Sequence, residues 1–367
     1  MKNKNFVFRV DSSKKIGSGH LMRTLTLAKG LREKGCICSF LSRSLDGNLN
    51  HFILSEGFAL KELPSPDKNY TIANTNTKKN GHIEWLEVDW KNDARETKEI
   101  LSDINPDWLV VDHYSISEDW EKAVLCKNFR IMVIDDLADR KHICDILLDQ
   151  NLGSNDFLYK NLVPETCKKF FGPKYALLRP EFPENRSLSL KRRKEGKLKN
   201  ILINFGGGNP DNFIQKTLQA LLNVDLPKDA SITVIFGGID AINDEHRLLI
   251  SKFKIKVKVF EMIKNMSEIL IDTDLVIGAA GSSSWERCCL GIPSLVFSLG
   301  LNQNRIAKEL SNVGAAIYLE EHDLQTYKLN LLFKDLMQDN KLRKISQNAS
   351  SVCPGSGLNI IIDELIN

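Results

Sequence analysis

The stretch FVFRVDSSKKIGSGHLMR, Phe6 to Arg23, decides the fold of this chain. Its first part, Phe6 to Val10, is a run of apolar and β-branched residues with the length of a buried strand. Gly17 and Gly19 follow, and from His20 onward apolar residues recur at helical spacings of three and four. The pattern predicts a strand, a glycine turn and a helix, an arrangement that brings backbone N–H groups close to a bound anion.

Size and composition indicate an ordinary globular protein with room for two domains. The chain has 367 residues, 42% of them apolar and 26% charged. A net charge of +3 is too small to predict a nucleic-acid or anionic membrane partner. Eight cysteines without a Cys-x-x-Cys pair are typical of reduced thiols, so we expect a cytoplasmic protein. The seven histidines form no i, i+4 pair, and no metal site is predicted.

Strand and helix patterns alternate in both halves of the chain, which predicts an α/β fold of two doubly wound parallel sheets. A polar, aperiodic stretch over residues 65–81 is predicted to be a surface loop. The basic segment LSLKRRKEGKLK, Leu188 to Lys199, is interpreted as a solvated linker. The predicted domains are therefore residues 1–187 and 200–367, joined by a linker over 188–199.

Ligands of open parallel sheets bind beyond the carboxyl ends of the strands, and polar residues gather there in both halves. In the first half these are Gly17 to His20, Asp112, His113, Tyr114, Asp135 and Asp136. In the second half they are the glycine triplet that includes Gly207, the run Gly281, Ser282, Ser283, Ser284, Trp285 and Glu286, and the pair Asn302 and Gln303.

Each of these groups also has a purely structural interpretation. His20 could simply line or cap a helix start. Ser282 could be an N-cap, and Glu286 could do no more than favour the helix dipole. In the functional interpretation, Gly281 to Ser284 bind a pyrophosphate and Glu286 accepts both hydroxyl groups of a ribose.

Several motifs together resemble the PseG family. They are Arg9, Asp11, Ile16, Gly17, Gly19, His20 and Arg23 at the start, Asp112 to Tyr114, Cys144 to Leu148, Ala176 to Arg179, and Phe205 to Gly207. The family comprises hydrolases of UDP-2,4-diacetamido-2,4,6-trideoxy-β-L-altropyranose in pseudaminic acid biosynthesis. The likeness runs from about residue 6 to about residue 315. It implies a GT-B fold related to MurG, with two Rossmann-like domains facing across a cleft.

The resemblance implies that His20 is the catalytic base and that the second domain holds UDP around Gly281 and at Asn302 and Gln303. A small-molecule UDP-sugar is then the substrate, cleaved with inversion and without a metal ion or cofactor. The expected sugar site comprises Gly17, Gly19, Arg23, Asp112, His113 and Tyr114.

On chemical grounds a base must take a proton from the attacking water, and a neutral imidazole suits this task. Either Asp11 or Asp112 could orient the other nitrogen of His20, and the sequence leaves both open. Asp11 and Tyr114 are counted with His20 as catalytic candidates. Two alternative functions remain: a glycosyltransferase with the same UDP-sugar donor, and a nucleotide-sugar-binding module without catalysis.

Overall fold

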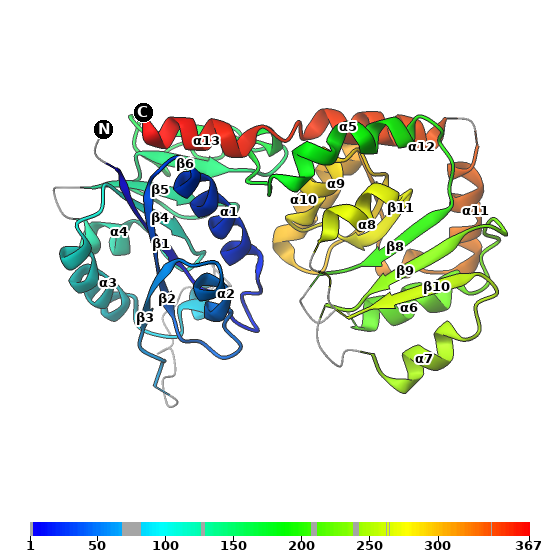
Figure 1. Ribbon diagram of the computed structural model, residues 1–367, viewed down its shortest axis with the longest axis horizontal. Helices are drawn as coiled ribbons and strands as arrows, with labels where there is room; N and C mark the ends of the chain where they lie inside the picture. Colours follow the sequence, from blue (N-terminus) through cyan, green and yellow to red (C-terminus); the bar gives the residue numbers. More distant parts are fainter. Residues whose placement is uncertain are drawn as a thin grey trace. The chain divides into compact units, whose positions relative to one another are not determined.

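The computed structural model describes residues 3–67, 82–125, 129–206, 211–237, 242–261, 263, 265–338 and 340–367. The polar stretch predicted as a loop therefore falls largely outside the described residues. The chain forms two compact units, which Figure 1 shows with their elements labelled. Unit 1 comprises Met1–Leu177 and Gly357–Asn367, and unit 2 comprises Leu178–Ser356. Each contains a parallel sheet, so the predicted α/β class with two doubly wound domains is confirmed.

Unit 1 is built on a seven-stranded parallel sheet with the order β3-β2-β1-β4-β5-β6-β7. Its strands are β1 (Asn5–Val10), β2 (Ile37–Arg43), β3 (Ala59–Leu63), β4 (Trp108–Asp112), β5 (Arg130–Ile134), β6 (Ile146–Asp149) and β7 (Lys168–Phe171). Its helices are α1 (Gly19–Glu33), α2 (Asn50–Ser55), α3 (Trp90–Ile104), α4 (Glu118–Val124) and α13 (Gly357–Ile366), with 3₁₀ turns η1 (Ile83–Leu86) and η2 (Pro173–Tyr175).

The central strands of unit 1 are apolar on both faces because helices cover both sides of the sheet. In β1, Phe6 and Phe8 point into one buried cluster, and Val7 points into the other. Strand β1 pairs with both β2 and β4, so it lies in the middle of the sheet. The predicted strand over Phe6 to Val10 is confirmed, and it carries the glycine turn to the sheet's carboxyl edge.

Unit 2 is built on a six-stranded parallel sheet with the order β10-β9-β8-β11-β12-β13. Its strands are β8 (Asn200–Asn204), β9 (Ser231–Ile235), β10 (Lys256–Phe260), β11 (Leu275–Ala279), β12 (Ser294–Phe297) and β13 (Ile317–Tyr318). Its helices are α5 (Glu181–Arg193), α6 (Asp211–Leu221), α7 (Asp244–Ile250), α8 (Met266–Asp272), α9 (Ser283–Cys289), α10 (Leu301–Asn312), α11 (Thr326–Leu336) and α12 (Lys341–Val352), with the turn η3 (Glu321–Asp323).

The last helix does not belong to the unit predicted for it. Residues 357–367 return to unit 1, where α13 packs on α1, as Figure 1 shows. Ile361, Ile362 and Leu365 are buried in the unit 1 core. A Cβ on Gly30 would lie 2.4 Å from the terminal methyl group of Ile362, so a larger residue here would have to displace that side chain where α1 packs on α13. The amphipathic pattern of this segment predicts a helix but cannot say which sheet it covers.

The structure also differs from the predicted linker over residues 188–199. Helix α5 of unit 2 runs through Arg193, and its basic side chains satisfy carbonyl groups at the ends of other helices. Arg193 is buried and donates to Leu270 O at 2.8 Å and to Thr273 O at 2.6 Å, at the end of α8. Cations at helix C-termini satisfy otherwise unpaired carbonyls and favour the helix dipole. Arg193 is therefore structural, whereas Lys191, Lys194, Lys197 and Lys199 are exposed, as the prediction of a solvated segment requires. No described helix has the length and apolarity to cross a membrane.

Candidate active site

The strand order creates one topological switch point in each sheet, and the candidate site residues lie at these two points. In unit 1, β1 lies between β2 and β4, so the loops after β1 and β4 diverge to opposite faces of the sheet. In unit 2, β8 lies between β9 and β11 in the same way. Open parallel sheets bind ligands in the crevice between such diverging loops.

The turn after β1 is held by its own hydrogen bonds. Ser13 Oγ accepts from the Ile16 N–H at 3.1 Å, and Gly17 N donates to Ser13 O at 2.8 Å. Gly17 has φ of +77° and open space at its Cβ position, so this glycine is required by backbone conformation and not by crowding. Helix α1 then begins at Gly19, which places His20 in its first turn.

His20 is oriented by Asp112, the last residue of β4. The distance from His20 Nδ1 to Asp112 Oδ1 is 2.6 Å. Burial alone would raise the pKa of Asp112, but the charges of Arg23 and His20 outweigh it and hold this pKa well below its usual range. An ionised carboxylate only accepts hydrogen bonds, so Nδ1 carries the proton and Nε2 of the neutral ring is an acceptor. Among the described residues, none hydrogen-bonds to Nε2.

Arg23 fixes the carboxylate that orients His20. Its Nε and Nη2 atoms each lie 2.6 Å from an oxygen of Asp112, a bidentate contact. Its Nη1 lies 2.6 Å from Asp136 Oδ2, just beyond β5. The Tyr114 hydroxyl donates to the same oxygen at 2.7 Å, and the Tyr114 ring meets the His20 ring edge-on at 4.5 Å. Burial, followed by the Asp136 charge, raises the pKa of Tyr114 well above its usual value.

The two remaining polar candidates of unit 1 lie beneath this site. Asp11 accepts from the Arg9 guanidinium at 2.6 Å and from the Arg43 N–H at 2.7 Å. Both arginines also contact Asp93 of α3, and His113 Nε2 lies 3.3 Å from Asp11 Oδ2. All five residues are at most 3% exposed. Asp11 therefore does not orient His20, and this placement differs from the predicted catalytic role of Asp11 and sugar contact of His113.

An aromatic group beside His20 was missed from the sequence. The Trp85 and Tyr114 rings stack at 5.4 Å with planes inclined by 22°, and the His82 ring meets Trp85 edge-on at 4.5 Å. Burial lowers the pKa of His82. His82 and Trp85 directly follow the aperiodic polar stretch, and no periodic pattern in the sequence associates them with the strand ends.

In unit 2 the turn after β11 meets the start of α10. A Cβ on Gly281 would lie 3.7 Å from Gln303 Nε2, so these two predicted residues are neighbours. The Gln303 Oε1 atom accepts from the Leu299 N–H at 3.1 Å, which fixes the amide orientation. Asn302 is exposed in the first turn of α10. Gly206 N donates to Asn204 Oδ1 at 2.8 Å, whereas Gly207 lies outside the described residues.

Glu286 lies in the first turn of α9, as predicted, and is 23% exposed on its side chain. Burial raises its pKa although Arg179 opposes this shift. The Arg179 guanidinium lies 3.6 Å from Glu286 Oε1 and 3.1 Å from Glu181 Oε1. Ser282 occupies the N-cap position of α9, as the structural interpretation has it, but its side chain is exposed and makes no cap hydrogen bond.

The serines after Gly281 are fixed by a buried arginine that the sequence did not single out. Arg287 donates to Ser283 Oγ at 3.2 Å, to Ser284 Oγ at 2.9 Å and to Ala279 O at 2.8 Å. Because guanidinium groups only donate, both hydroxyl oxygens act as acceptors and their protons are directed elsewhere. No described carboxylate lies within 4.0 Å of this guanidinium, and burial lowers its pKa to about 10.

Comparison with known proteins identifies the fold class. Residues 201–354 match the Glycosyltransferase family 28 C-terminal domain. The crystal structure of Acinetobacter baumannii MurG covers 99% of both chains with a TM-score of 0.70 at 16% identity. The fold is GT-B. The GT-B class that the PseG resemblance implied is thus confirmed.

Two sequence relatives extend the comparison of this GT-B chain. An uncharacterised protein of Methanocaldococcus jannaschii is 30% identical over 305 residues, and the match covers 82% of this chain and 56% of that protein. This chain therefore spans little more than half the length of that relative. The UDP-2,4-diacetamido-2,4,6-trideoxy-β-L-altropyranose hydrolase of Campylobacter jejuni is 27% identical over 309 residues, covering 84% of this chain and 96% of the hydrolase.

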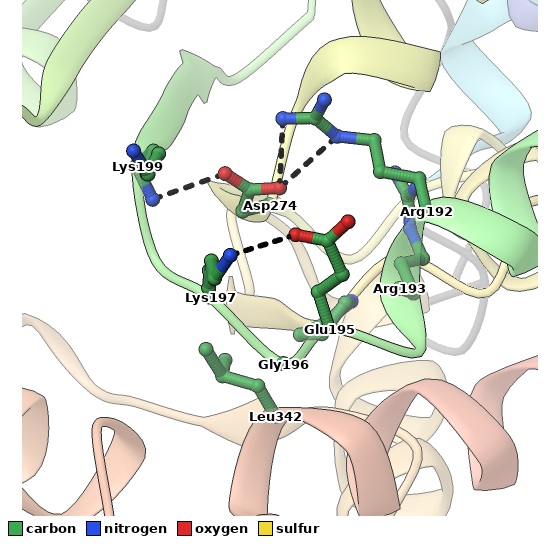
Figure 2. Close-up of a pocket in the computed structure, with 9 residues that line it drawn as sticks. Arg192, Arg193, Glu195, Gly196, Lys197, Lys199, Asp274 and Leu342 are labelled. Carbon is green, nitrogen blue, oxygen red and sulfur yellow. Dashed lines mark hydrogen bonds and ion pairs between the residues drawn. The ribbon is translucent and has the colours of Figure 1, made fainter.

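A pocket of about 260 Å³ in unit 2 lies away from the GT-B switch point. It is lined by Arg192, Arg193, Glu195, Gly196, Lys197, Lys199, Asp274, Pro293 and Leu342, near the amino ends of β8, β11 and β12. Figure 2 shows that its charges pair with one another: Arg192 with Asp274 at 3.1 Å and Lys197 with Glu195 at 3.0 Å. We therefore assign the candidate site to the carboxyl edges and not to this pocket. Among the described residues, no three side chains are grouped as a metal site.

Proposed function

We propose that this protein hydrolyses a UDP-linked sugar at its anomeric carbon and releases UDP and the free sugar. The contact between His20 Nδ1 and Asp112 at 2.6 Å carries this proposal. With Nδ1 donating to Asp112, Nε2 is the unprotonated nitrogen that a general base for water requires. Water loses its proton to Nε2, its oxygen bonds to the anomeric carbon, and the bond from that carbon to the phosphate oxygen breaks. The electron pair of that bond leaves with UDP.

We propose that UDP binds to unit 2. The Ser283 and Ser284 hydroxyl groups, whose oxygens accept from Arg287, have protons to donate to phosphate oxygens. Glu286 is proposed to accept the ribose hydroxyl groups, exchanging its long contact with Arg179 for them. Donors that meet the charge growing on the leaving UDP stabilise the transition state.

The proposed sugar is 2,4-diacetamido-2,4,6-trideoxy-β-L-altropyranose. The Campylobacter jejuni relative, named for this substrate, supports the proposal because the match covers 96% of its length. The stacked rings of Trp85 and Tyr114 beside His20 also support it, since aromatic faces suit the methyl groups of a deoxy and N-acetylated sugar.

Transfer to an acceptor is the second candidate function, favoured by the match to the Glycosyltransferase family 28 C-terminal domain. In a transferase the same His20 would deprotonate an acceptor hydroxyl group in place of water. The two functions differ in whether UDP is released when no acceptor is present.

The deciding experiment mixes the purified protein with a panel of UDP-linked 2,4-diacetamido-2,4,6-trideoxy sugars and follows free UDP without any acceptor. Hydrolysis predicts stoichiometric UDP and free sugar. Transfer predicts UDP only after an acceptor is added, and a binding module predicts bound but intact UDP-sugar. In ¹⁸O-water the label should enter the sugar. Label in UDP would mean attack at phosphorus and would refute the proposed mechanism.

A further inference from the structure

The charges around His20 differ from those of a histidine with a single carboxylate partner. Arg23 contacts both oxygens of Asp112 at 2.6 Å. A guanidinium this close offsets the charge of the carboxylate, and Asp112 alone would then do little to stabilise a protonated His20. The contact of Arg23 Nη1 with Asp136 Oδ2, also 2.6 Å, changes this balance. One positive charge is shared between two carboxylates, and the three groups together carry a charge of −1.

Asp136 is held firmly in this arrangement. Its side chain is 10% exposed, and its Oδ2 atom accepts from both Arg23 and the Tyr114 hydroxyl group. Its Oδ1 atom is buried and has no hydrogen-bond partner among the described residues. The Oδ2 atom of Asp136 thus accepts both hydrogen bonds. The negative charge of the Asp136 carboxylate therefore remains only partly neutralised.

The other groups near His20 do not supply this compensation. The ionisable side chains around the ring come from α1, the end of β4, the turn before η1 and the segment after β5: Arg23, Asp112, Tyr114, His82 and Asp136. Tyr114 is a neutral donor, and burial lowers the pKa of His82, which disfavours a positive charge on that ring. Among these groups of the described structure, only Asp136 adds a second negative charge. Further out, Arg140 lies 5.9 Å from the centre of the Tyr114 ring and pairs with Asp135 and Asp139, and burial and the charge of Asp136 raise the pKa of Asp149 to about 7.

We propose that Asp136 is a positioning residue of the His20 site. It balances the charge of Arg23, so that the charge of Asp112 remains available to stabilise His20 when Nε2 takes the proton of water. The Nδ1 proton stays in its hydrogen bond to Asp112 throughout, and the proton on Nε2 passes to solvent after the sugar leaves. The expected effect on kcat rests on the proposed function. The expected effect of Asp136 on the protonation of His20 does not depend on it.

The test replaces Asp136 by asparagine, which removes the charge and keeps the shape. Loss of a nearby negative charge disfavours the protonated imidazole. For Asp136→Asn we therefore expect kcat to fall by about tenfold or more, KM to change little, and the acid limb of the pH–rate profile to move to lower pH. A purely structural role would lower the rate without moving that limb.

Asp139→Asn is the matched control. Asp139 lies three residues further along and pairs with Arg140 at 2.9 Å, and its side chain is 32% exposed. Its loss changes the net charge of the protein equally, and we expect the limb to stay in place. The conservative variant Asp136→Glu should restore the limb to its wild-type position even if the rate remains low.

A second readout does not depend on catalysis. The ring signals of His20 in histidine-labelled protein are followed by NMR against pH without substrate, and are identified by their loss in His20→Ala. The titration midpoint should move to lower pH in Asp136→Asn and return toward the wild type in the double variant Arg23→Gln, Asp136→Asn, which removes both charges. An unmoved midpoint in a folded Asp136→Asn protein overturns the inference even if hydrolysis is confirmed. A moved midpoint in a protein that cleaves no UDP-sugar would refute the proposed function and leave the inference standing.

Discussion

Charged side chains at the two switch points differ in whether they have a partner of opposite charge. In unit 1 nearly every charged group at the site has a close partner of opposite sign, as Arg23 does with Asp112 and Asp136 at 2.6 Å. In unit 2 the buried Arg287 contacts two hydroxyl oxygens and a carbonyl, and no described carboxylate pairs with it. A buried charge without a counter-ion is costly to a folded protein, which favours a site that receives an anion. This contrast supports the proposal that unit 1 fixes a proton and that unit 2 receives an anion.

The largest expected effect is on His20→Ala, in which kcat and UDP affinity should respond differently. In His20→Ala, kcat should fall by about two to four decades, because the base for water is lost. UDP affinity should stay within a few-fold, since the proposed phosphate and ribose contacts belong to unit 2. Steady-state kinetics and calorimetric titration with UDP measure the two quantities. His51→Ala, which removes an exposed histidine of α2, is the control and should match the wild type in both.

Three buried carboxylates of unit 1, those of Asp11, Asp112 and Asp135, predict a selective loss of stability in acid. Burial alone would raise the pKa of Asp135, but Arg140 and His142 outweigh it and lower this pKa to about 2. The pKa values of Asp11 and Asp112 are also held below their usual range, against burial, by Arg9 and Arg23 respectively. A depressed pKa stabilises the fold above the unfolded value near 3.9, and this stability is lost as the pH falls through the folded value. Asp135 alone accounts for roughly 2 kcal/mol.

We therefore expect unit 1 to open before unit 2 as the pH falls from about 4 toward 2. Glu286 of unit 2 and Asp149 of unit 1 have the opposite sign, because burial raises their pKa values, that of Asp149 to about 7, and protonation then favours the folded state; neither contributes to the loss below pH 4. Pepsin cleavage at graded pH, read by mass spectrometry, should show the first cuts within residues 1–177. First cuts within unit 2 would contradict the contrast between the two charge arrangements.

The smallest expected effect concerns the nucleotide. Glu286→Ala should weaken UDP binding by about 1–3 kcal/mol, because ribose hydroxyl groups lose their acceptor. Uracil base and inorganic pyrophosphate, which lack the ribose, should bind the variant as they bind the wild type. Glu181→Ala is the matched control, since it also removes a carboxylate partner of Arg179. Unchanged UDP affinity in folded Glu286→Ala would leave this carboxylate only its favourable interaction with the helix dipole.

The sequence by itself was sufficient for the alternation of elements and for the sheet edges that carry the polar residues. Periodicity is a local property, so β1, the glycine turn and α1 follow from neighbouring residues. The same holds for Glu286, whose place in the first turn of α9 depends only on the strand and helix around it. His20 could be singled out because a histidine in a glycine turn is visible in one short stretch.

Tertiary structure alone decided which distant groups meet. The choice of Asp112 over Asp11 depends on a contact across 92 positions, because Asp112 is the last residue of β4 and Asp11 directly follows β1, so both lie at the carboxyl edge of the sheet. The bridge from Arg23 to Asp136 spans 113 positions, and α13 returns to the unit 1 core from the far end of the chain. Sequence patterns report which face of an element is apolar, but the partner of a buried charge is set by strand order and packing, which bring together residues with no local relation.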